Sequence, residues 1–295
     1  MADGVPSITL SDGNLIPQLG FGTWQISTEE CAKVVGEAIA AGYRSFDTAQ
    51  TYSNEEGVGA AIRASGLPRG DFFISSKLRN SAHQRDLALR AFDETMKKLG
   101  IDQIDLFLLH WPVPAQDKFV EAWKALVELQ QQGHIRSIGV SNFDRDHLER
   151  IIGETGVAPV VNQIELHPLF QQRDRRGYHQ RRNIRIQSAS PLGPGTSSAA
   201  WWWTHGRSTT ANVLQDPAIN AIAKSHGRTP AQIVLRWHLQ EGLILYPKST
   251  KPEHMAENLK VFDFTLTAED IYRIEALDQP DGRIGVPPAE WNQTY

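Results

Sequence analysis

The stretch FFISSKLRNSAHQRDLALRAFDETMKKLGIDQIDLFLLH, residues 72–110, holds two short apolar runs separated by a helix-length segment. The runs 72–78 and 104–110 lack the polar alternation of a half-exposed strand, which is typical of strands covered on both faces in a parallel sheet. Between them, residues 85–99 have the apolar spacing of an amphipathic helix, and Gly100 follows as its stop signal. This order predicts one strand–helix–strand unit.

The same alternation continues in both directions along the chain. Further strands are predicted at 19–24, 43–49, 135–141, 159–166, 184–190 and 243–249, with helices at 28–41, 55–65, 118–132 and 145–155. Eight parallel strands with crossover helices close into a (β/α)8 TIM barrel. We expect one barrel domain over 1–295, with the tail 279–295 near the active-site mouth.

Local signals refine this prediction. Residues 8–10 and 15–19 flank the turn 11–14, which indicates an N-terminal β-hairpin that caps one end of the barrel. Thr28 is expected to be the N-cap of the first helix, and Gly42 to end it. The rival fold is an open doubly wound sheet, which predicts a GxGxxG turn after the first strand. Residues 20–25, GFGTWQ, lack its third glycine.

Composition narrows the class of protein. A net charge of −4 over 295 residues gives no global case for nucleic acid or an anionic membrane as partner. Cys31 is the only cysteine, so an internal disulfide and a thiolate metal cluster are both excluded. The N-terminus lacks the features of a secretory signal, and no apolar run approaches a membrane span. We expect a cytoplasmic enzyme without a metal.

Four polar residues occupy the ends of the second to fourth predicted strands: Asp47, Tyr52, Lys77 and His110. In a parallel barrel these strand ends share one face. Hydride reduction of a carbonyl places negative charge on its oxygen, and a positioned acid must neutralise that charge. Tyr52 is the expected acid, Lys77 is expected to lower its pKa, and Asp47 to hold Lys77. His110 is expected to orient the substrate oxygen or to share proton delivery.

Taken singly, these residues have ordinary structural explanations. Tyr52 could be a surface residue at a helix start, and Lys77 a lysine snorkelling from a strand end. His110 could be a core histidine. Their joint position at the same end of adjacent strands favours catalysis.

Motifs along nearly the whole chain resemble the aldo-keto reductase superfamily, with the bacterial 2,5-diketo-D-gluconic acid reductases as the nearest branch. They are FDTAQTY, ISSKL, LLHWP, IRSIGVSNF, VVNQIELHP, SPLGPG and PKST…EN. The resemblance implies a (β/α)8 barrel, NADPH as cofactor with NADH as a weaker alternative, and a monomer. It implies reduction of small carbonyl compounds, and it gives Asp47, Tyr52, Lys77 and His110 the roles of a catalytic tetrad.

The resemblance also assigns ligand contacts. The residues implied for the cofactor are Thr23, Trp24, Ser141, Asn142, Gln163, Leu192, Gly193, Lys248, Ser249, His254, Glu257 and Asn258. Ser141 and Asn142 also fit a helix N-cap, and both roles are compatible. Those implied for the substrate are Trp24, Tyr52, His110 and Trp111.

Two positions depart from the family pattern. Ala189 stands where an aromatic ring commonly stacks on the nicotinamide, and one of Trp201–Trp203 could supply that ring instead. His254 stands where an arginine commonly binds the adenosine 2′-phosphate, so the preference for NADPH over NADH should be reduced.

Other functions stay open at this point. Lys77 could form a Schiff base in a barrel lyase or aldolase. With Ala189 in place of a stacking ring, the chain could be a non-catalytic dinucleotide-binding subunit. The arginine-rich run 173–185 could bind nucleic acid, although a solvated helix face explains it better.

Overall fold

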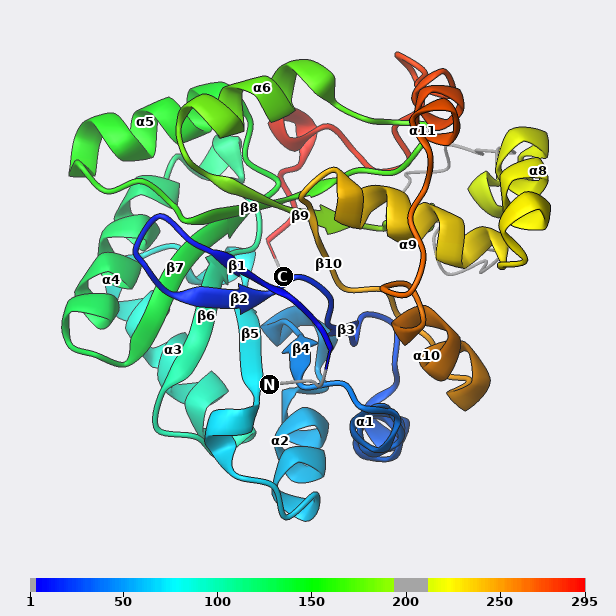
Figure 1. Ribbon diagram of the computed structural model, residues 1–295. Helices are drawn as coiled ribbons and strands as arrows, with labels where there is room; N and C mark the ends of the chain where they lie inside the picture. The colour runs from blue at the N-terminus through cyan, green and yellow to red at the C-terminus, as the bar shows by residue number, and fades with distance from the viewer. Residues whose placement is uncertain (1–3, 194–211, 295) are drawn as a thin grey trace.

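The computed structural model describes residues 4–193 and 212–294. Eight parallel strands form one sheet in the order of the chain (Figure 1). They are β3 (Phe21–Gly22), β4 (Ser45–Asp47), β5 (Phe73–Leu78), β6 (Ile104–Leu109), β7 (Ile135–Ser141), β8 (Val161–Glu165), β9 (Arg185–Ala189) and β10 (Ile244–Leu245). Backbone bonds between the first and last segments close the barrel: Gly20 N donates to Leu245 O at 2.8 Å, and Leu245 N to Gln18 O at 2.9 Å.

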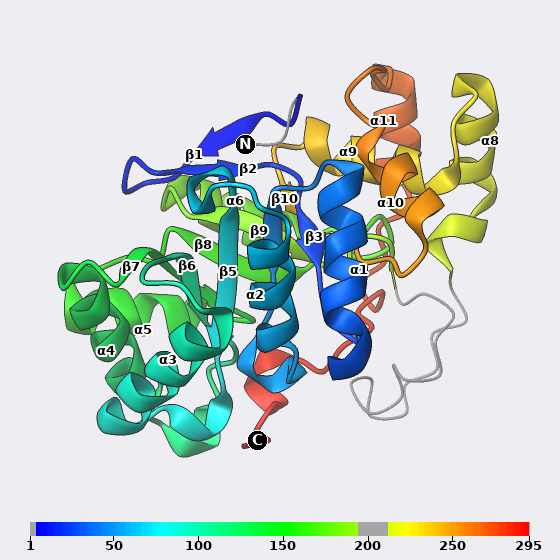
Figure 2. The same ribbon diagram turned by 90° about the horizontal axis from the view of Figure 1, so that it is seen from below.

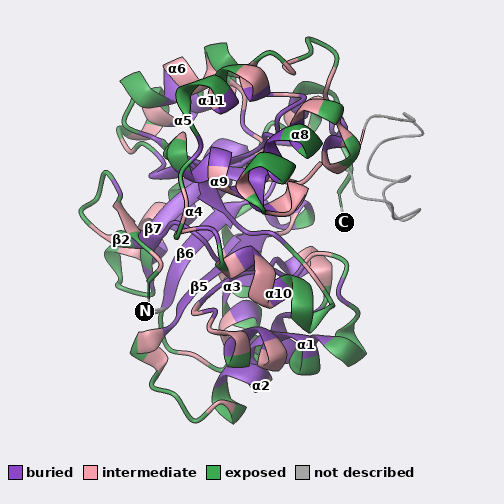
Figure 3. Cartoon of the chain, turned by 45° about the vertical axis from the view of Figure 1, so that its right-hand side comes forward, coloured by how far each residue is buried: buried purple, intermediate pink, exposed green. Residues whose placement is uncertain are grey.

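Helices surround the barrel and connect its strands (Figure 1). In chain order they are α1 (Thr28–Ala41), α2 (Glu55–Ala64), α3 (Arg85–Leu99), α4 (Phe119–Gln131), α5 (Arg145–Thr155), α6 (Arg173–Arg181), α8 (Pro217–His226), α9 (Pro230–Gln240), α10 (Pro252–Leu259) and α11 (Ala268–Glu275). Their outward faces are exposed while the strands are buried (Figure 3). The predicted (β/α)8 barrel is confirmed.

The predicted N-terminal hairpin consists of β1 (Ser7–Thr9) and β2 (Leu15–Pro17), which pair antiparallel. Figure 2 shows it at one end of the barrel and the C-terminal segment at the other. Leu10 and Ile16 pack with apolar side chains of the strands, among them Leu106 and Leu108. Polar contacts anchor the turn, because Asp12 Oδ2 accepts a hydrogen bond of 2.7 Å from Ser137 Oγ. The hairpin therefore plugs the amino-terminal end of the barrel.

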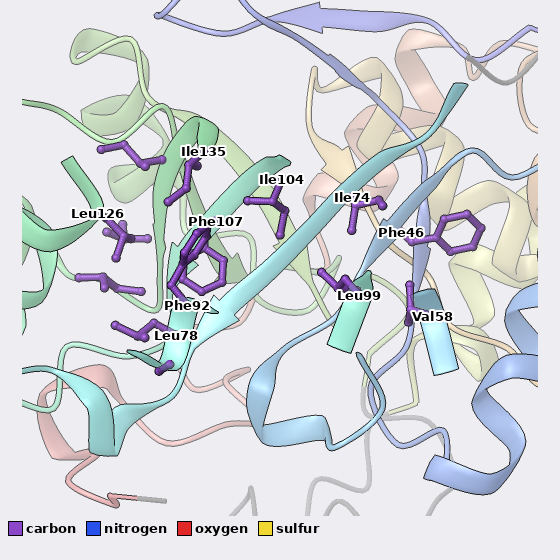
Figure 4. Packing of buried hydrophobic residues seen from close by; sticks show 14 of the residues in the cluster. Phe46, Val58, Ile74, Leu78, Phe92, Leu99, Ile104, Phe107, Leu126 and Ile135 are labelled. Atoms are coloured by element: carbon purple, nitrogen blue, oxygen red, sulfur yellow. The ribbon is translucent and has the colours of Figure 1, made fainter. Parts of the chain in front are cut away.

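Successive residues of β5 and β6 alternate between two packing layers, as the pleat of a strand requires. On the outside, Ile74 and Phe107 belong to the cluster between strands and helices that also contains Phe92 (Figure 4). On the inside, Phe73 and Leu106 belong to the cluster beneath the hairpin. The polar residues that share the inward face are thus delivered to the barrel interior.

Several local expectations need correction. The N-cap of α1 is Ser27, whose Oγ accepts the Glu30 amide, whereas Thr28 is already helical and its hydroxyl donates to Ser53 O at 2.9 Å. The first and last barrel strands are only two residues long, shorter than the predicted 19–24 and 243–249. The arginine-rich run 173–185, in contrast, agrees with the favoured explanation of a helix face, because residues 173–181 form α6.

Two helical glycines give a matched test of the packing. A Cβ on Gly59 of α2 would lie 2.2 Å from the Leu99 carbonyl oxygen, whereas a Cβ on Gly36 of α1 would meet nothing within 4 Å. Gly59→Ala should lower the free energy of unfolding by about 2 kcal/mol or more through overpacking. Gly36→Ala should raise it by about 0.5–1 kcal/mol through helix propensity. Urea unfolding of both variants checks this, and a neutral Gly59→Ala would contradict the close helix approach.

Candidate active site

A buried ion pair lies at the carboxyl-terminal end of the barrel interior. Lys77 Nζ, on β5, contacts Asp47 Oδ2, the last residue of β4, at 2.6 Å. The lysine also donates to the Thr48 carbonyl at 2.8 Å, and Ser75 Oγ donates to Asp47 Oδ1 at 2.6 Å. Lys77 is fully buried, and its charge is compensated by these oxygens. Burial opposes the charge on Lys77, but the Asp47 carboxylate outweighs burial and raises the pKa of Lys77, so it is an ammonium.

Tyr52 is placed over this pair by a short 3-10 turn, η1 (Gln50–Tyr52), directly after β4. Lys77 Nζ lies 5.1 Å from the centroid of its ring. The turn is anchored to α3, because Gln50 Nε2 donates to the Ala91 carbonyl at 2.6 Å and to Thr95 Oγ1 at 2.9 Å. The phenol therefore sits on a rigid element beside the ammonium.

Burial and charge compete for the pKa of Tyr52. Burial raises it, Lys77 lowers it by favouring phenolate, and the net direction is upward. The expected lowering by Lys77 is present, but desolvation outweighs it and sets the net direction. Tyr52 is protonated at neutral pH, as a proton donor must be.

His110 follows β6 and faces Tyr52 edge-on, with ring centroids 5.7 Å apart. Its Nδ1 lies 3.3 Å from Thr51 Oγ1, a contact that restricts the ring. Burial, followed by the charge of Lys77, holds the pKa of His110 well below its ordinary value. The imidazole is therefore neutral, and the structure brings all four predicted catalytic residues together.

Three of these residues, Asp47, Tyr52 and His110, line a cavity of about 570 Å³, and Lys77 is buried behind them. Of the predicted ligand contacts, its walls include Trp24, Trp111, Ser141, Asn142, Gln163, Leu192, Gly193 and Lys248. Asn142 has a left-handed backbone with φ of 62°, and its side chain donates to the His110 carbonyl at 3.0 Å. This bond ties the end of β7 to the end of β6 at the cavity wall.

The other predicted cofactor residues do not line this cavity. Thr23 is fully buried, and its hydroxyl donates to the Asp47 carbonyl at 3.1 Å, so it supports the loop beneath Trp24. Ser249 follows β10, and its hydroxyl accepts the Lys251 amide at 3.0 Å. The remaining three lie on α10: His254, Glu257 and Asn258. Apart from the buried Thr23, the predicted contacts therefore form two groups, one in the cavity and one in α10 and the loop before it.

Ala189, the last residue of β9, lines the cavity without contributing a ring. The candidate replacements Trp201–Trp203 lie outside the described residues. His254 is exposed on the first turn of α10. Both departures from the family pattern thus occupy positions open to a ligand.

Several site residues were missed from the sequence. Gln187 Nε2 donates to Asp47 Oδ1 at 3.3 Å, and Tyr246 lines the cavity while its hydroxyl lies 2.9 Å from Ser45 Oγ. A period-two count from Lys77 would have found Ser75 on the same inward face. Nothing in the local sequence marks Gln187 or Tyr246.

The C-terminal tail reaches the cavity through an aromatic pair. Trp291 stacks on Trp111 with ring centroids 4.7 Å apart and planes inclined by 22°. The Ala115 amide donates to Asn292 Oδ1 at 3.0 Å, and Asn80 Nδ2 donates to the Gln293 carbonyl at 2.8 Å. The tail therefore backs the wall that Trp111 forms.

The arginines of α6 are largely neutralised by nearby acids. Arg175 pairs with Asp144, and Arg173 lies 3.6 Å from Glu275. Internal pairing of this kind does not leave a free basic stripe for a phosphate backbone. Within residues 4–193 and 212–294, no helix is long and apolar enough to cross a bilayer, and no cluster of three or more potential ligands is placed to hold a metal.

Comparison with known proteins gives a consistent result. Residues 18–279 match the Aldo/keto reductase family. The chain is 47% identical over 289 residues to an aldo-keto reductase of Mycolicibacterium smegmatis, covering 98% of this chain and 99% of the relative. It is 46% identical over 284 residues to methylglyoxal reductase DkgA of Escherichia coli K12, covering 96% and 97%.

Solved structures agree with the sequence relatives. A variant of Gox0644 crystallised in complex with NADPH superposes with a TM-score of 0.90 at 48% identity, covering 98% of this chain and 99% of that one. An aldo/keto reductase from Brucella melitensis gives a TM-score of 0.85 at 48% identity, covering 93% and 100%. With this barrel, this buried ion pair and these relatives, the chain belongs to the aldo/keto reductase family and is an oxidoreductase.

Proposed function

We propose that this protein reduces small polar aldehydes and ketones to alcohols with NADPH, and that Tyr52 is the general acid. The observation that carries the proposal is the contact between Tyr52 and a buried, charged Lys77 that Asp47 holds at 2.6 Å. The substrate class is that of α-dicarbonyls and keto-sugar acids such as 2,5-diketo-D-gluconate. A relative named methylglyoxal reductase at 46% identity supports the dicarbonyl part of this class.

The donor set of the cavity fits a nicotinamide cofactor. Amide groups of Asn142 and Gln163 and the hydroxyl of Ser141 suit a carboxamide, which both donates and accepts hydrogen bonds. Lys248 places a cation on the same wall, toward α10, where phosphate groups need one. His254, Glu257 and Asn258 would hold the adenosine end. When bound, the cofactor supplies the hydride.

The chain's own residues supply the proton and the electrostatic environment. Tyr52 donates its phenolic proton to the carbonyl oxygen as negative charge develops there. Lys77 stabilises the phenolate that remains, and Asp47 keeps Lys77 charged and in place. His110, neutral because of burial, hydrogen-bonds the substrate oxygen without adding a competing charge. The low-polarity walls, including Trp24 and Trp111, exclude water and strengthen each of these interactions.

A Schiff-base mechanism on Lys77 is disfavoured by the same contacts. A nucleophilic lysine must be a neutral amine, whereas the pKa of Lys77 is raised and Nζ is held by Asp47 and the Thr48 carbonyl. The second candidate is a weakly active NAD(P)H-binding barrel subunit, favoured only by Ala189 on the cavity wall.

Removal of one hydroxyl tests the role of Tyr52. Tyr52→Phe should keep NADPH binding, measured by fluorescence titration, while reduction falls by at least about a hundredfold, because positioned acid catalysis contributes that much. NADPH consumption at 340 nm with methylglyoxal and 2,5-diketo-D-gluconate provides the rates.

Tyr43→Phe is the matched control, since the Tyr43 hydroxyl donates to the Met255 carbonyl at 3.2 Å on the outside of the barrel. It should cost about 1 kcal/mol of stability and leave turnover intact. Near-normal turnover in Tyr52→Phe would refute the proposed acid. If the unmodified protein binds NADPH and reduces these compounds and other aldehydes only slowly, the weakly active alternative is correct.

Cofactor preference should change at the first turn of α10. His254→Arg adds a bidentate charged donor, worth roughly 1.5–3 kcal/mol against phosphate, so the NADPH/NADH affinity ratio should rise about tenfold or more. His254→Gln, which adds no charge, should leave the ratio close to its starting value. The dissociation constants for NADPH and NADH are measured by fluorescence titration. Equal NADPH/NADH affinity ratios in the unmodified protein and both variants would show that this position does not contact the 2′-phosphate.

Restoring a ring at the end of β9 tests the empty wall position. Ala189→Trp should lower the NADPH dissociation constant by up to about tenfold, from a stacking energy of roughly 0.5–1.5 kcal/mol. Ala189→Leu adds apolar area without an aromatic face and should achieve less. Weaker NADPH binding in Ala189→Trp would mean that this wall is already filled, as it would be if one of Trp201–Trp203 supplies the ring.

A further inference from the structure

The C-terminal tail is fastened to the turn that follows β8. The Gln279 amide donates to the Leu169 carbonyl at 3.1 Å. The guanidinium carbon of Arg283 lies 4.7 Å from the centre of the Phe170 ring. A Cβ on Gly282 would lie 1.9 Å from the Leu169 carbonyl oxygen, so only glycine permits this approach. The tail thus crosses the turn in close backbone contact.

A buried carboxylate is the strongest of these fastenings. Glu165, the last residue of β8, is 3% exposed. Its Oε1 accepts the Ile284 amide at 2.6 Å and its Oε2 accepts the Gly285 amide at 2.9 Å. His167 Nε2 lies 3.2 Å from Oε1, and Arg283 lies 4.0 Å from Oε2. Both oxygens are therefore engaged by consecutive donors of the tail.

The segment after this fastening builds the cavity wall. Val286 packs in one apolar cluster with Val113, Trp111 and Trp291. Trp291 is 1% exposed and stacks on Trp111, which itself lines the cavity. A shift of Glu165 would therefore move the nearby tail segment that carries Trp291, whose indole packs behind Trp111 at the cavity wall.

We propose that Glu165 is a positioning residue, which fixes the tail by its two amide bonds and so sets Trp291 and Trp111 as the wall against which the carbonyl substrate lies. This inference rests on the proposed function, because it takes the cavity as the substrate site. Glu165 acts through the tail and contacts no reacting atom.

The charge of Glu165 is compatible with this role. Burial alone would raise its pKa, but the hydrogen bond from His167, the Ile284 amide and Arg283 outweigh burial, and the pKa lies below its ordinary value. The carboxylate is thus ionised at neutral pH and can accept both amides. A glutamine would keep one accepting oxygen and turn an NH₂ group toward the other donors.

The decisive comparison is Glu165→Gln with Asp105→Asn. Asp105 is also a buried carboxylate that accepts a backbone amide, that of Ile74 at 2.9 Å, and it lies near the opposite end of the barrel. In Glu165→Gln, amide hydrogen exchange of residues 284–291 should accelerate about tenfold or more, and KM for methylglyoxal should rise about fivefold with kcat within twofold. Asp105→Asn should change neither, although its unfolding midpoint falls.

A double-mutant cycle separates positioning from general stability. If Glu165 acts through Trp291, the KM of Glu165→Gln/Trp291→Ala should equal that of Trp291→Ala alone. Gly282→Ala provides a second route, because it displaces the tail with Glu165 unchanged and should reproduce the KM increase. That variant keeps the test open if Glu165→Gln does not fold.

Three results would overturn the inference. They are unchanged exchange of 284–291 in Glu165→Gln, equal KM effects in Glu165→Gln and Asp105→Asn, or full additivity in the cycle. The exchange measurement needs no turnover. It therefore tests whether Glu165 holds the tail even if Tyr52→Phe refutes the proposed acid.

Discussion

The ion pair between Lys77 and Asp47 is the constraint that organises this barrel. Two charges removed from water are tolerated only where further hydrogen bonds compensate them, and loss of one partner of such a pair typically costs about 3–5 kcal/mol. Here the compensating groups come from separate strands: Ser75 on β5, Gln163 on β8 and Gln187 on β9 all reach Asp47. The site is therefore complete only in the closed barrel, because an open sheet would not bring these donors together.

The interior is divided into an apolar and a polar layer. Beneath the pair, Phe73, Leu106 and Leu108 fill the space that the hairpin covers. Above it, Tyr52 and His110 face the cavity. The apolar layer lowers the local polarity, which strengthens the ion pair and at the same time keeps the phenol protonated and the imidazole neutral. The same packing is thus compatible with a charged Lys77, a protonated Tyr52 and a neutral His110.

Sequence reasoning succeeded where a local signal coincided with a strand end. Asp47, Lys77 and His110 stand at or directly after β4, β5 and β6, so the parallel topology alone predicts that they converge. It could not decide features that depend on competing energies or on distant residues. The direction of the Tyr52 pKa depends on how far burial outweighs Lys77, and the contact of Gln187 with Asp47 joins strands 140 positions apart. The N-cap of α1 was misplaced by one residue because Ser27 and Thr28 both suit it, and a contact to Ser53 decides between them.

The hairpin that plugs the amino-terminal end has a consequence for the catalytic cycle. With that end filled by Leu10 and Ile16, ligands of the described part of the barrel reach the reacting groups from the cavity side alone. Reactant and product must then share one passage and cannot move through it in a continuous stream. Each turnover must therefore include a step in which the cavity empties before it is filled again, and this exchange places an upper limit on the rate that is independent of how fast the proton and hydride move.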